Sequence, residues 1–329
     1  MKLIRRPLRS RRARYTGLAV GALTVALTAT ACGSSDSSDT ADADKTPAPP
    51  ASSEESSAAD SAAVQTAFTS YASSKSFDDT VSALKKSVAD SGMMVLGDLN
   101  QAGALKSTGL NLKGAHSFFV GNPAKGKMFF QQNPAIGTEI PIRMFVWADE
   151  DGKGHVGYFD PAAMFTAVDE QLADGGKQMA MAADKIAQGA TGGSAEAGTK
   201  VAASFVSVDS AKSFADTESA LKKSVADSGM MVLGDLNQAG ALKSTGLNLK
   251  GAHAYFVGNP AKGKMFFQQN PAIGTVIPLR MYVWADDDGK AHIGYYDPAP
   301  LFTAIDPKLA DGGKQMKMAA EKISHGAVK

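Results

Sequence analysis

Apolar residues recur along this chain at two spacings, one typical of helices and one typical of strands. Phe77, Val81, Leu84 and Val88 follow the three- and four-residue steps of an amphipathic helix. The serine in front of them is a good N-cap residue, and a glycine follows the last step. The pattern predicts a helix over about 76–91.

Shorter apolar runs, bounded by Gly, Pro, Asn and Asp, indicate strands. Asp151-Gly152 lies between two such runs, which is typical of a β-hairpin, and Asn122-Pro123 indicates a second helix start. The patterns predict strands over 64–71, 93–96, 116–120, 140–148 and 155–160, and helices over 76–91, 102–106, 122–132 and 176–187. This order, with strands mostly neighbours in sequence, predicts an α+β domain with helices on one side of an antiparallel sheet.

The whole pattern occurs twice, with a constant offset of 137 residues and no gap. Of the 115 aligned positions that begin at Ser76 and Ser213, 20 differ, and most of the changes are conservative. A repeat of this length is a complete domain, longer than a solenoid unit. Val81 becomes Glu218, which predicts that this position lies at the rim of the helix's apolar face, because a carboxylate is costly inside a core. The chain divides into a first repeat domain over 64–190, a Gly-, Ala- and Ser-rich linker over 191–199 and a second repeat domain over 200–329.

Residues 1–31 have the organisation of a signal peptide. Seven basic residues and no acid precede an apolar run over 17–31, which is shorter than a membrane span. Residues 27–32 resemble a bacterial lipobox and end in Cys32, the single cysteine of the chain. We expect Cys32 to be lipidated and residues 32–63, without aromatic or large aliphatic side chains, to form a disordered tether.

These features predict a lipoprotein on the outer face of a bacterial cell membrane, with membrane lipid as the partner of acylated Cys32. Both general secretion and twin-arginine export stay open as routes. Removal of the leader takes 7 of the 34 basic residues and leaves 27 against 33 acidic ones, a net charge of −6. An acidic chain without a basic run has no electrostatic footprint for nucleic acid.

Several motifs recur in both repeats. The first repeat carries Gly121-Asn122-Pro123, Pro134 with Gly137, Pro141 and Asp160-Pro161, and the second carries the same residues 137 positions later. In these motifs each repeat resembles the domain of unknown function 302 family, nearly end to end. The resemblance implies a long helix against a curved antiparallel sheet, in outline similar to the TATA-box binding protein, and frequent pairing as a dimer. It implies no established activity or cofactor. Some relatives carry a central cysteine, and its absence from both repeats excludes thiol chemistry there.

Beyond the leader, arginine occurs only at Arg143 and the equivalent Arg280. A two-residue hairpin turn would place Arg143 opposite Asp160, whereas an odd loop length would separate the two. The candidate ligand or interface residues are Arg143, Trp147, Tyr158 and Asp160 in the first repeat, and Arg280, Trp284, Tyr295 and Asp297 in the second. Three roles stay open for this set: a cross-strand ion pair covered by aromatic rings, a face that binds an anionic ligand, and an interface between the repeats.

Metal binding has weak support. His116 and His155 recur as His253 and His292, but no third ligand stands at a recognisable zinc spacing. Adjacent or alternate methionines point in different directions, which favours core packing over copper chelation. We expect no metal centre and no catalytic residue from spacing alone, since no hydrolase or zinc-protease motif occurs.

The sequence therefore favours a non-enzymatic binding or interaction module of unknown ligand, in which the two repeats pack on each other as an intramolecular pseudo-dimer. The alternative is an enzyme or a redox-linked accessory that acts on a small anionic molecule.

Overall fold

The computed structural model describes residues 59–60 and 63–329, so the predicted signal peptide, Cys32 and nearly all of the tether lie outside the described residues. The first repeat comprises β2 (Val64–Ser76), α1 (Phe77–Asp90), β3 (Met94–Asn100), α2 (Gln101–Lys106), β4 (Ala115–Gly121), α3 (Pro123–Gln132), the 3₁₀ helix η1 (Pro134–Thr138), β5 (Ile142–Ala148), β6 (Lys153–Phe159), α4 (Pro161–Val168), η2 (Glu170–Leu172) and α5 (Ala173–Thr191).

The second repeat has the same elements in the same order, except that two strands, β7 and β8, precede its first helix. It comprises β7 (Ala195–Ala203), β8 (Phe205–Ser210), α6 (Phe214–Asp227), β9 (Met231–Asn237), α7 (Gln238–Lys243), β10 (Ala252–Gly258), α8 (Pro260–Gln269), η3 (Pro271–Thr275), β11 (Leu279–Ala285), β12 (Ala291–Tyr296), α9 (Pro298–Ile305), η4 (Pro307–Leu309) and α10 (Ala310–Val328). A short strand, β1 (Ala59–Asp60), precedes the first repeat.

Capping residues set the helix limits where the sequence predicts them. The Ser76 side chain accepts a hydrogen bond from the Asp79 amide at 3.2 Å, and Gly92, with φ of 66°, follows the end of α1. Asn122 accepts from the amides of Ala124 and Lys125 at the start of α3. The predicted rim position is half-buried as Val81 and as Glu218.

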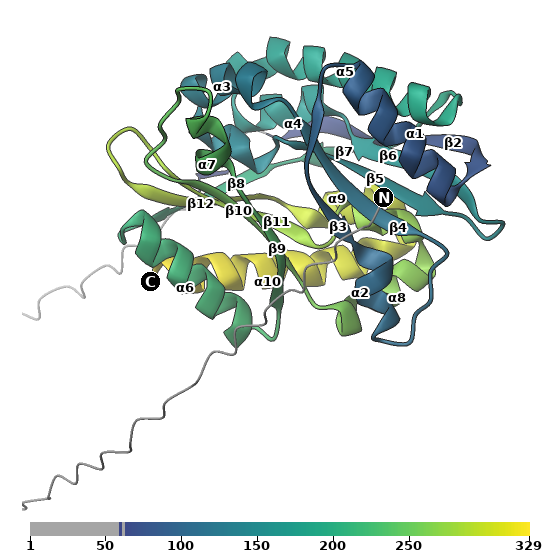
Figure 1. The fold of residues 1–329 in the computed structure, drawn as a ribbon. Coiled ribbons are helices and arrows are strands. Elements are labelled where there is room, and N and C mark those ends of the chain that lie inside the picture. Colours follow the sequence, from purple (N-terminus) through teal and green to yellow (C-terminus); the bar gives the residue numbers. More distant parts are fainter. Residues whose placement is uncertain (1–58, 61–62) are drawn as a thin grey trace, which may run out of the picture. The chain divides into compact units, whose positions relative to one another are not determined.

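Two antiparallel six-stranded sheets form the centre of the molecule. Their orders are β3-β4-β5-β6-β2-β7 and β9-β10-β11-β12-β8-β1. Figure 1 shows α1 and α5 on one side of the paired sheets and α6 and α10 on the other. Each sheet thus has its own helices on one face and meets the other repeat with its second face, and the predicted α+β class is confirmed.

The repeats exchange strands at the sheet edges. β7, which leads into the second repeat, pairs with β2 of the first, and β1 pairs with β8 of the second. In the β2–β7 ladder Gln65 faces Ala202, and these two positions are equivalent because the repeat offset is 137. An approximate two-fold axis therefore passes between them. The segment expected to be a linker is mostly ordered: α5 extends to Thr191, and β7 begins at Ala195.

Helix α4 and its equivalent α9 lie outside the sequence predictions. Five of the eight residues of α4 are buried, and every residue after the initial Pro161 except Thr166 is apolar. A helix that is apolar nearly all round lacks the 3.6-residue alternation by which surface helices are detected. This explains why the pattern of the sequence gives no sign of it.

The methionines only partly fill the core. Met93, Met144 and Met281 are buried as expected, but Met94, Met128, Met181, Met231, Met265 and Met318 are all exposed. The prediction of methionine as core filler is wrong for these six exposed side chains.

The 3₁₀ helices bring the two repeats into close contact. A Cβ atom on Gly137 of η1 would lie 2.2 Å from the ring of Tyr282, and one on Gly274 of η3 would lie 2.1 Å from the ring of Phe145. Both rings are fully buried. Glycine is needed at these two positions because an aromatic ring of the other repeat packs directly on the backbone.

We expect Gly274→Ala to lower the free energy of unfolding by about 1–3 kcal/mol, since the buried ring of Phe145 has to move. Chemical denaturation measures the change. Gly126→Ala is the matched control, because its Cβ would lie 3.8 Å from the nearest side-chain atom and alanine favours helix. Equal midpoints for the two variants would contradict the close approach.

Candidate functional site

Arg143 on β5 and Arg280 on β11 project from the sheet faces that meet. Arg143 donates to the main-chain oxygens of Thr275 at 3.1 Å and Pro278 at 2.8 Å, both in the second repeat. Arg280 donates to the main-chain oxygens of Thr138, Glu139 and Pro141 in the first. Each arginine thus binds the main chain of the other repeat.

Two phenylalanines support the arginines. Phe119 of β4 and Phe256 of β10 stack with ring centroids 4.2 Å apart. Each guanidinium carbon lies between 5.3 and 5.6 Å from both ring centroids, within the range of a cation–π contact. Two cations and two rings, one of each from each repeat, therefore form the centre of the interface.

A small cavity lies between the arginines, and we call it the axial cavity. Its volume is about 70 Å³, and it is lined by Thr138, Glu139, Arg143, Phe159, Met164, Thr275, Val276, Leu279, Arg280, Tyr296 and Leu301. Glu139 is its single carboxylate, and the equivalent position in the second repeat is Val276. The two repeats therefore contribute different charges to this cavity, although they are otherwise nearly symmetric.

Burial shifts the ionisation of this cluster. It raises the pKa of Glu139 to about 8, although Arg280 and Arg143 act in the opposite direction. Burial and the positive charge of Arg280 lower the pKa of Arg143 to about 9, although Glu139 acts in the opposite direction. The pKa of Arg280 is lowered too, again chiefly by burial.

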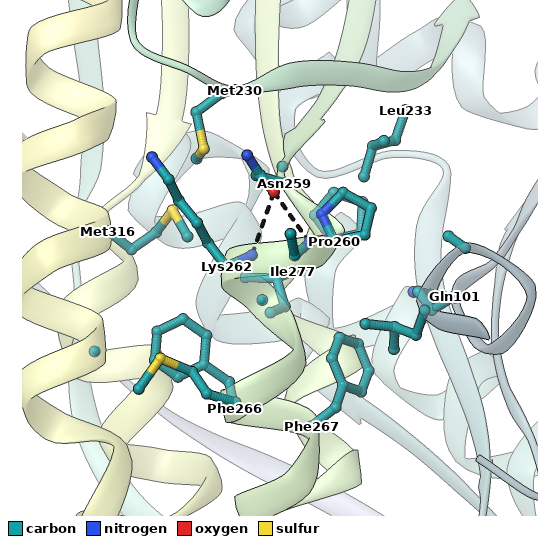
Figure 2. A pocket seen from close by; sticks show the side chains of 18 of the residues that line it. Gln101, Met230, Leu233, Asn259, Pro260, Lys262, Phe266, Phe267, Ile277 and Met316 are labelled. Atoms are coloured by element: carbon teal, nitrogen blue, oxygen red, sulfur yellow. Dashed lines mark hydrogen bonds between the residues drawn. The ribbon is translucent and has the colours of Figure 1, made fainter. Parts of the chain in front are cut away.

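Two larger pockets lie where α2 or α7 of one repeat approaches the helices of the other, and we call them the lateral pockets. The larger, of about 420 Å³, combines Gln101, Ala104 and Leu105 of α2 with residues of β9, β10, α8 and α10. Figure 2 shows Gln101 on a helix of the first repeat, across the pocket from Met316, with Phe266 and Phe267 of α8 between them. The second pocket, of about 240 Å³, is lined mostly by the equivalent residues, with α7 as the contributed helix.

The lining of the lateral pockets is apolar. In the larger pocket the side chains include Met230, Met265, Phe266, Ile277 and Met316, all on the second repeat. Lys262, the single ionisable residue among those that line it, stands in the first turn of α8. Each of the 21 positions that line this pocket holds the same residue in the other copy.

Glutamines join each lateral pocket to the interface. Gln101 donates to the main-chain oxygen of Gly274 at 3.3 Å, and Gln238 donates to that of Gly137 at 2.9 Å. Both glutamines are buried. The short helices α2 and α7 are thereby held against the opposite repeat, which completes the pocket walls.

The cross-strand ion pair of Arg143 with Asp160, one of the three roles left open for this set, does not form. The hairpin has three residues between Asp149 and Lys153, and an odd loop separates the faces. Asp160 instead caps α4 and accepts from the Ala162 amide at 2.9 Å. In the second repeat Asp297 likewise caps α9, and it pairs with Lys317 at 2.8 Å.

Tyr158 does not accompany Arg143 either. It lies on the helix side of the sheet, where its hydroxyl and that of Tyr71 donate to Asp184 of α5. Tyr295 is buried in the corresponding core of the second repeat. Trp147 and Trp284 do share the face of the arginines, where each stacks on a neighbouring ring, Phe145 and Tyr282 respectively.

The histidines pair with carboxylates at sheet edges and turns. His116 lies 2.6 Å from Asp98, and His155 lies 3.3 Å from Asp149. His253 bridges Glu218 and Asp235, and His292 bridges Asp209 and Asp286. Across residues 63–329 no group of three or more His, Cys, Asp or Glu side chains could hold a metal ion.

Four kinds of interface residue escape a reading of the sequence: the stacked phenylalanines, the glutamines, the threonines of the axial cavity and Glu139. One signal was present. Positions 139, 142 and 145 differ between the copies inside the otherwise identical stretch 121–148. Such a cluster of changes marks the place where the two copies meet an unequal environment.

A tandem pair of α+β domains that share one interface defines the class of this protein. The family model "Domain of unknown function DUF302" matches residues 69–189 and 206–325, more than half of the chain. The chain belongs to the DUF302 family. A crystal structure of an uncharacterized conserved DUF302 protein from Bacillus stearothermophilus is 21% identical, with a TM-score of 0.35, and the alignment covers 37% of this chain and 97% of that one.

Three Brucella proteins are also similar to this chain over 97 residues, with 31% identity and 30% of this chain covered. They are "Fluoride-specific ion channel FluC 1" of Brucella suis and of Brucella abortus, and "Fluoride-specific ion channel FluC 2" of Brucella melitensis. The alignments cover 36–38% of their lengths. From residue 63 onward, the present chain has no helix long and apolar enough to cross a membrane.

We expect Glu139→Gln to raise the melting temperature at pH 8.5, on the order of 5 °C, and to leave it unchanged near pH 4. The folded state keeps the Glu139 proton up to about pH 8, whereas the unfolded chain loses it near the ordinary value of 4.5. The stability of the natural protein therefore falls as the pH rises between these values, and glutamine removes that fall.

Thermal unfolding from pH 4 to 8.5 measures this difference. Glu150→Gln is the control, because Glu150 is an exposed carboxylate outside the axial cavity. Parallel pH profiles for Glu139→Gln and the natural chain would contradict the raised pKa of Glu139.

Proposed function

We propose that this protein is an anchored binding module that holds small amphiphilic molecules in its two lateral pockets. The observation that carries the proposal is that each lateral pocket is lined by both repeats and that all of its lining residues are identical in the two copies. A single repeat would leave each pocket without one wall. Pairing within one chain therefore supplies two equivalent sites.

The lining supports a ligand with an apolar body. Volumes of about 420 and 240 Å³ suit a small molecule, and apolar walls with a few polar groups are typical of ligand sites. Methionine adapts its shape to different apolar partners. The pockets thus favour a flexible or variable hydrocarbon moiety.

The polar end of the ligand is proposed to be anionic. Lys262 in the larger pocket and Lys125 in the smaller are the ionisable lining residues, and neither has an ion-pair partner among the residues that the structure describes. The amides of the first turn of α8 are already capped by Asn259, so the lysine is the group left to meet a negative charge.

Catalysis has less support than binding. No histidine, cysteine or carboxylate is among the residues that line either lateral pocket. General acid–base and nucleophilic mechanisms draw mainly on those side chains. The alternative of an enzyme that acts on a small anionic molecule would have to rely on a lysine and a serine, Lys262 with Ser228 or Lys125 with Ser91, without a histidine or carboxylate in the lining to activate them.

The Brucella relatives bear names that concern fluoride conduction, and their similarity is restricted to 97 residues. We propose that the shared segment is an accessory binding domain and that ion conduction in those proteins belongs to the rest of their chains. The lack of a membrane-spanning helix over residues 63–329 here supports this division.

The proposed ligand class predicts two binding sites for the fluorescent anionic probe 1-anilinonaphthalene-8-sulfonate, with decanoate as competitor. Ala319→Phe should remove the larger site and Ala182→Phe the smaller, because each alanine lines one pocket and a phenyl ring occupies its volume. The double variant should bind neither compound. Titration calorimetry and fluorescence give the stoichiometry.

Ala89→Phe is the matched control, since Ala89 is exposed on α1 and lines neither pocket. Two sites retained in the double variant would refute the assignment.

Decanoate should compete better than decanol, and Lys262→Gln should remove that advantage at the larger pocket.

The anchored location is proposed from the leader and Cys32, which lie outside the described residues. Cys32→Ser should move the protein from the membrane fraction to the soluble extracytoplasmic fraction, because stable anchoring depends on acyl chains. Cell fractionation and the mass of the processed chain test this. Membrane retention of the serine variant would exclude lipidation at Cys32 as the anchor.

A further inference from the structure

The axial cavity is a second, chemically different site. It lies between the repeats, and four of the six pairs of equivalent positions that contribute to it differ between the copies: 139 and 276, 142 and 279, 159 and 296, and 164 and 301. The lateral pockets show no such difference. The residues that line the lateral pockets are thus the same in both repeats, whereas most of those that form the axial cavity differ.

Its charges do not balance. The lining holds Arg143 and Arg280 against the single carboxyl group of Glu139, so positive charge is in excess whether Glu139 is protonated or ionised. The hydrogen bonds of both guanidinium groups go to main-chain oxygens, which carry no formal charge. Val276 is the equivalent of Glu139. Glu139 stands near Arg280, so the near-symmetry of the repeats places the uncharged Val276 near Arg143.

Two buried hydroxyls share the cavity. Thr138 is 2% exposed and Thr275 is 6% exposed, and both line it. Neither Oγ1 atom has a hydrogen-bond partner within the described part of the chain. Buried hydroxyls are normally hydrogen-bonded, so a pair of them beside a surplus cation indicates a group that accepts hydrogen bonds.

We propose that the axial cavity binds one small monovalent inorganic anion, of halide size, between the two arginines and the hydroxyls of Thr138 and Thr275. A bound anion offsets positive charge that the lining residues leave without a counter-charge. A volume of about 70 Å³ suits a small ion, and it is well below the roughly 300 Å³ at which pockets for larger organic ligands begin. Burial, followed by the positive charge of Arg280, lowers the pKa of Arg143, and a bound anion would act against both effects.

The first test is thermal unfolding of the purified full-length chain in sodium fluoride, chloride or bromide, with gluconate replacing the halide at constant ionic strength. We expect a saturable rise in melting temperature of several degrees with at least one halide, because a ligand that binds the folded state stabilises it. Bromide located by anomalous scattering should lie in the axial cavity.

The variant Val276→Glu tests whether the halide effect depends on the excess positive charge of the axial cavity. It places a second carboxylate where the near-symmetry puts the partner of Arg143, so the halide effect should disappear while the fold persists. Val232→Glu is the matched control, since Val232 is exposed and outside the cavity, and it should keep the effect. An equal response of Val276→Glu and the natural chain would overturn the proposal.

If Val276→Glu does not fold, the double variant Thr138→Val with Thr275→Val supplies the decision. Valine keeps the shape and removes the hydroxyls, so the anion site predicts loss of the halide response. An unchanged halide response, or water as the sole occupant in the bromide data, would refute the anion site.

Discussion

The structure depends on two arginines that each repeat can satisfy only with the main chain of the other. A buried guanidinium is costly unless its donors are met, and the acceptors here are main-chain oxygens at residues 275 and 278 for Arg143 and at 138, 139 and 141 for Arg280. The stacked pair Phe119 and Phe256 excludes water from both. The lateral pockets and the axial cavity follow from this reciprocal contact, because each is lined by both repeats.

The positions of the differences between the two copies can be interpreted only from the folded structure. Of the 20 differences, four fall at pairs of positions that contribute to the axial cavity, and none falls at a position that lines a lateral pocket. At the axial cavity, the pair of positions 139 and 276 holds one glutamate and one valine, so two arginines face a single carboxyl group.

Local chemistry made much of the fold predictable. Ser76 and Asn122 cap helices as expected, and the hairpin forms where Asp-Gly interrupts two apolar runs. The prediction failed for features that have no local sequence pattern. Helix α4 is apolar nearly all round, and the odd length of the hairpin loop, which separates Tyr158 and Asp160 from Arg143, is a detail of backbone geometry. The sequence pattern does not single out Glu139, because only folding brings it into one cavity with Arg280 of the other repeat.

Periodicity, capping and repetition are properties of the linear chain, and they are enough to establish the two-domain organisation, the α+β class, the family and the uniqueness of the two arginines. The role of those arginines follows only from the contacts between the folded repeats. Their acceptors lie more than 130 positions away, and the pocket walls and the unbalanced charge on the axis arise from residues that meet only after both repeats have folded. Contacts of that range leave no local pattern in the sequence.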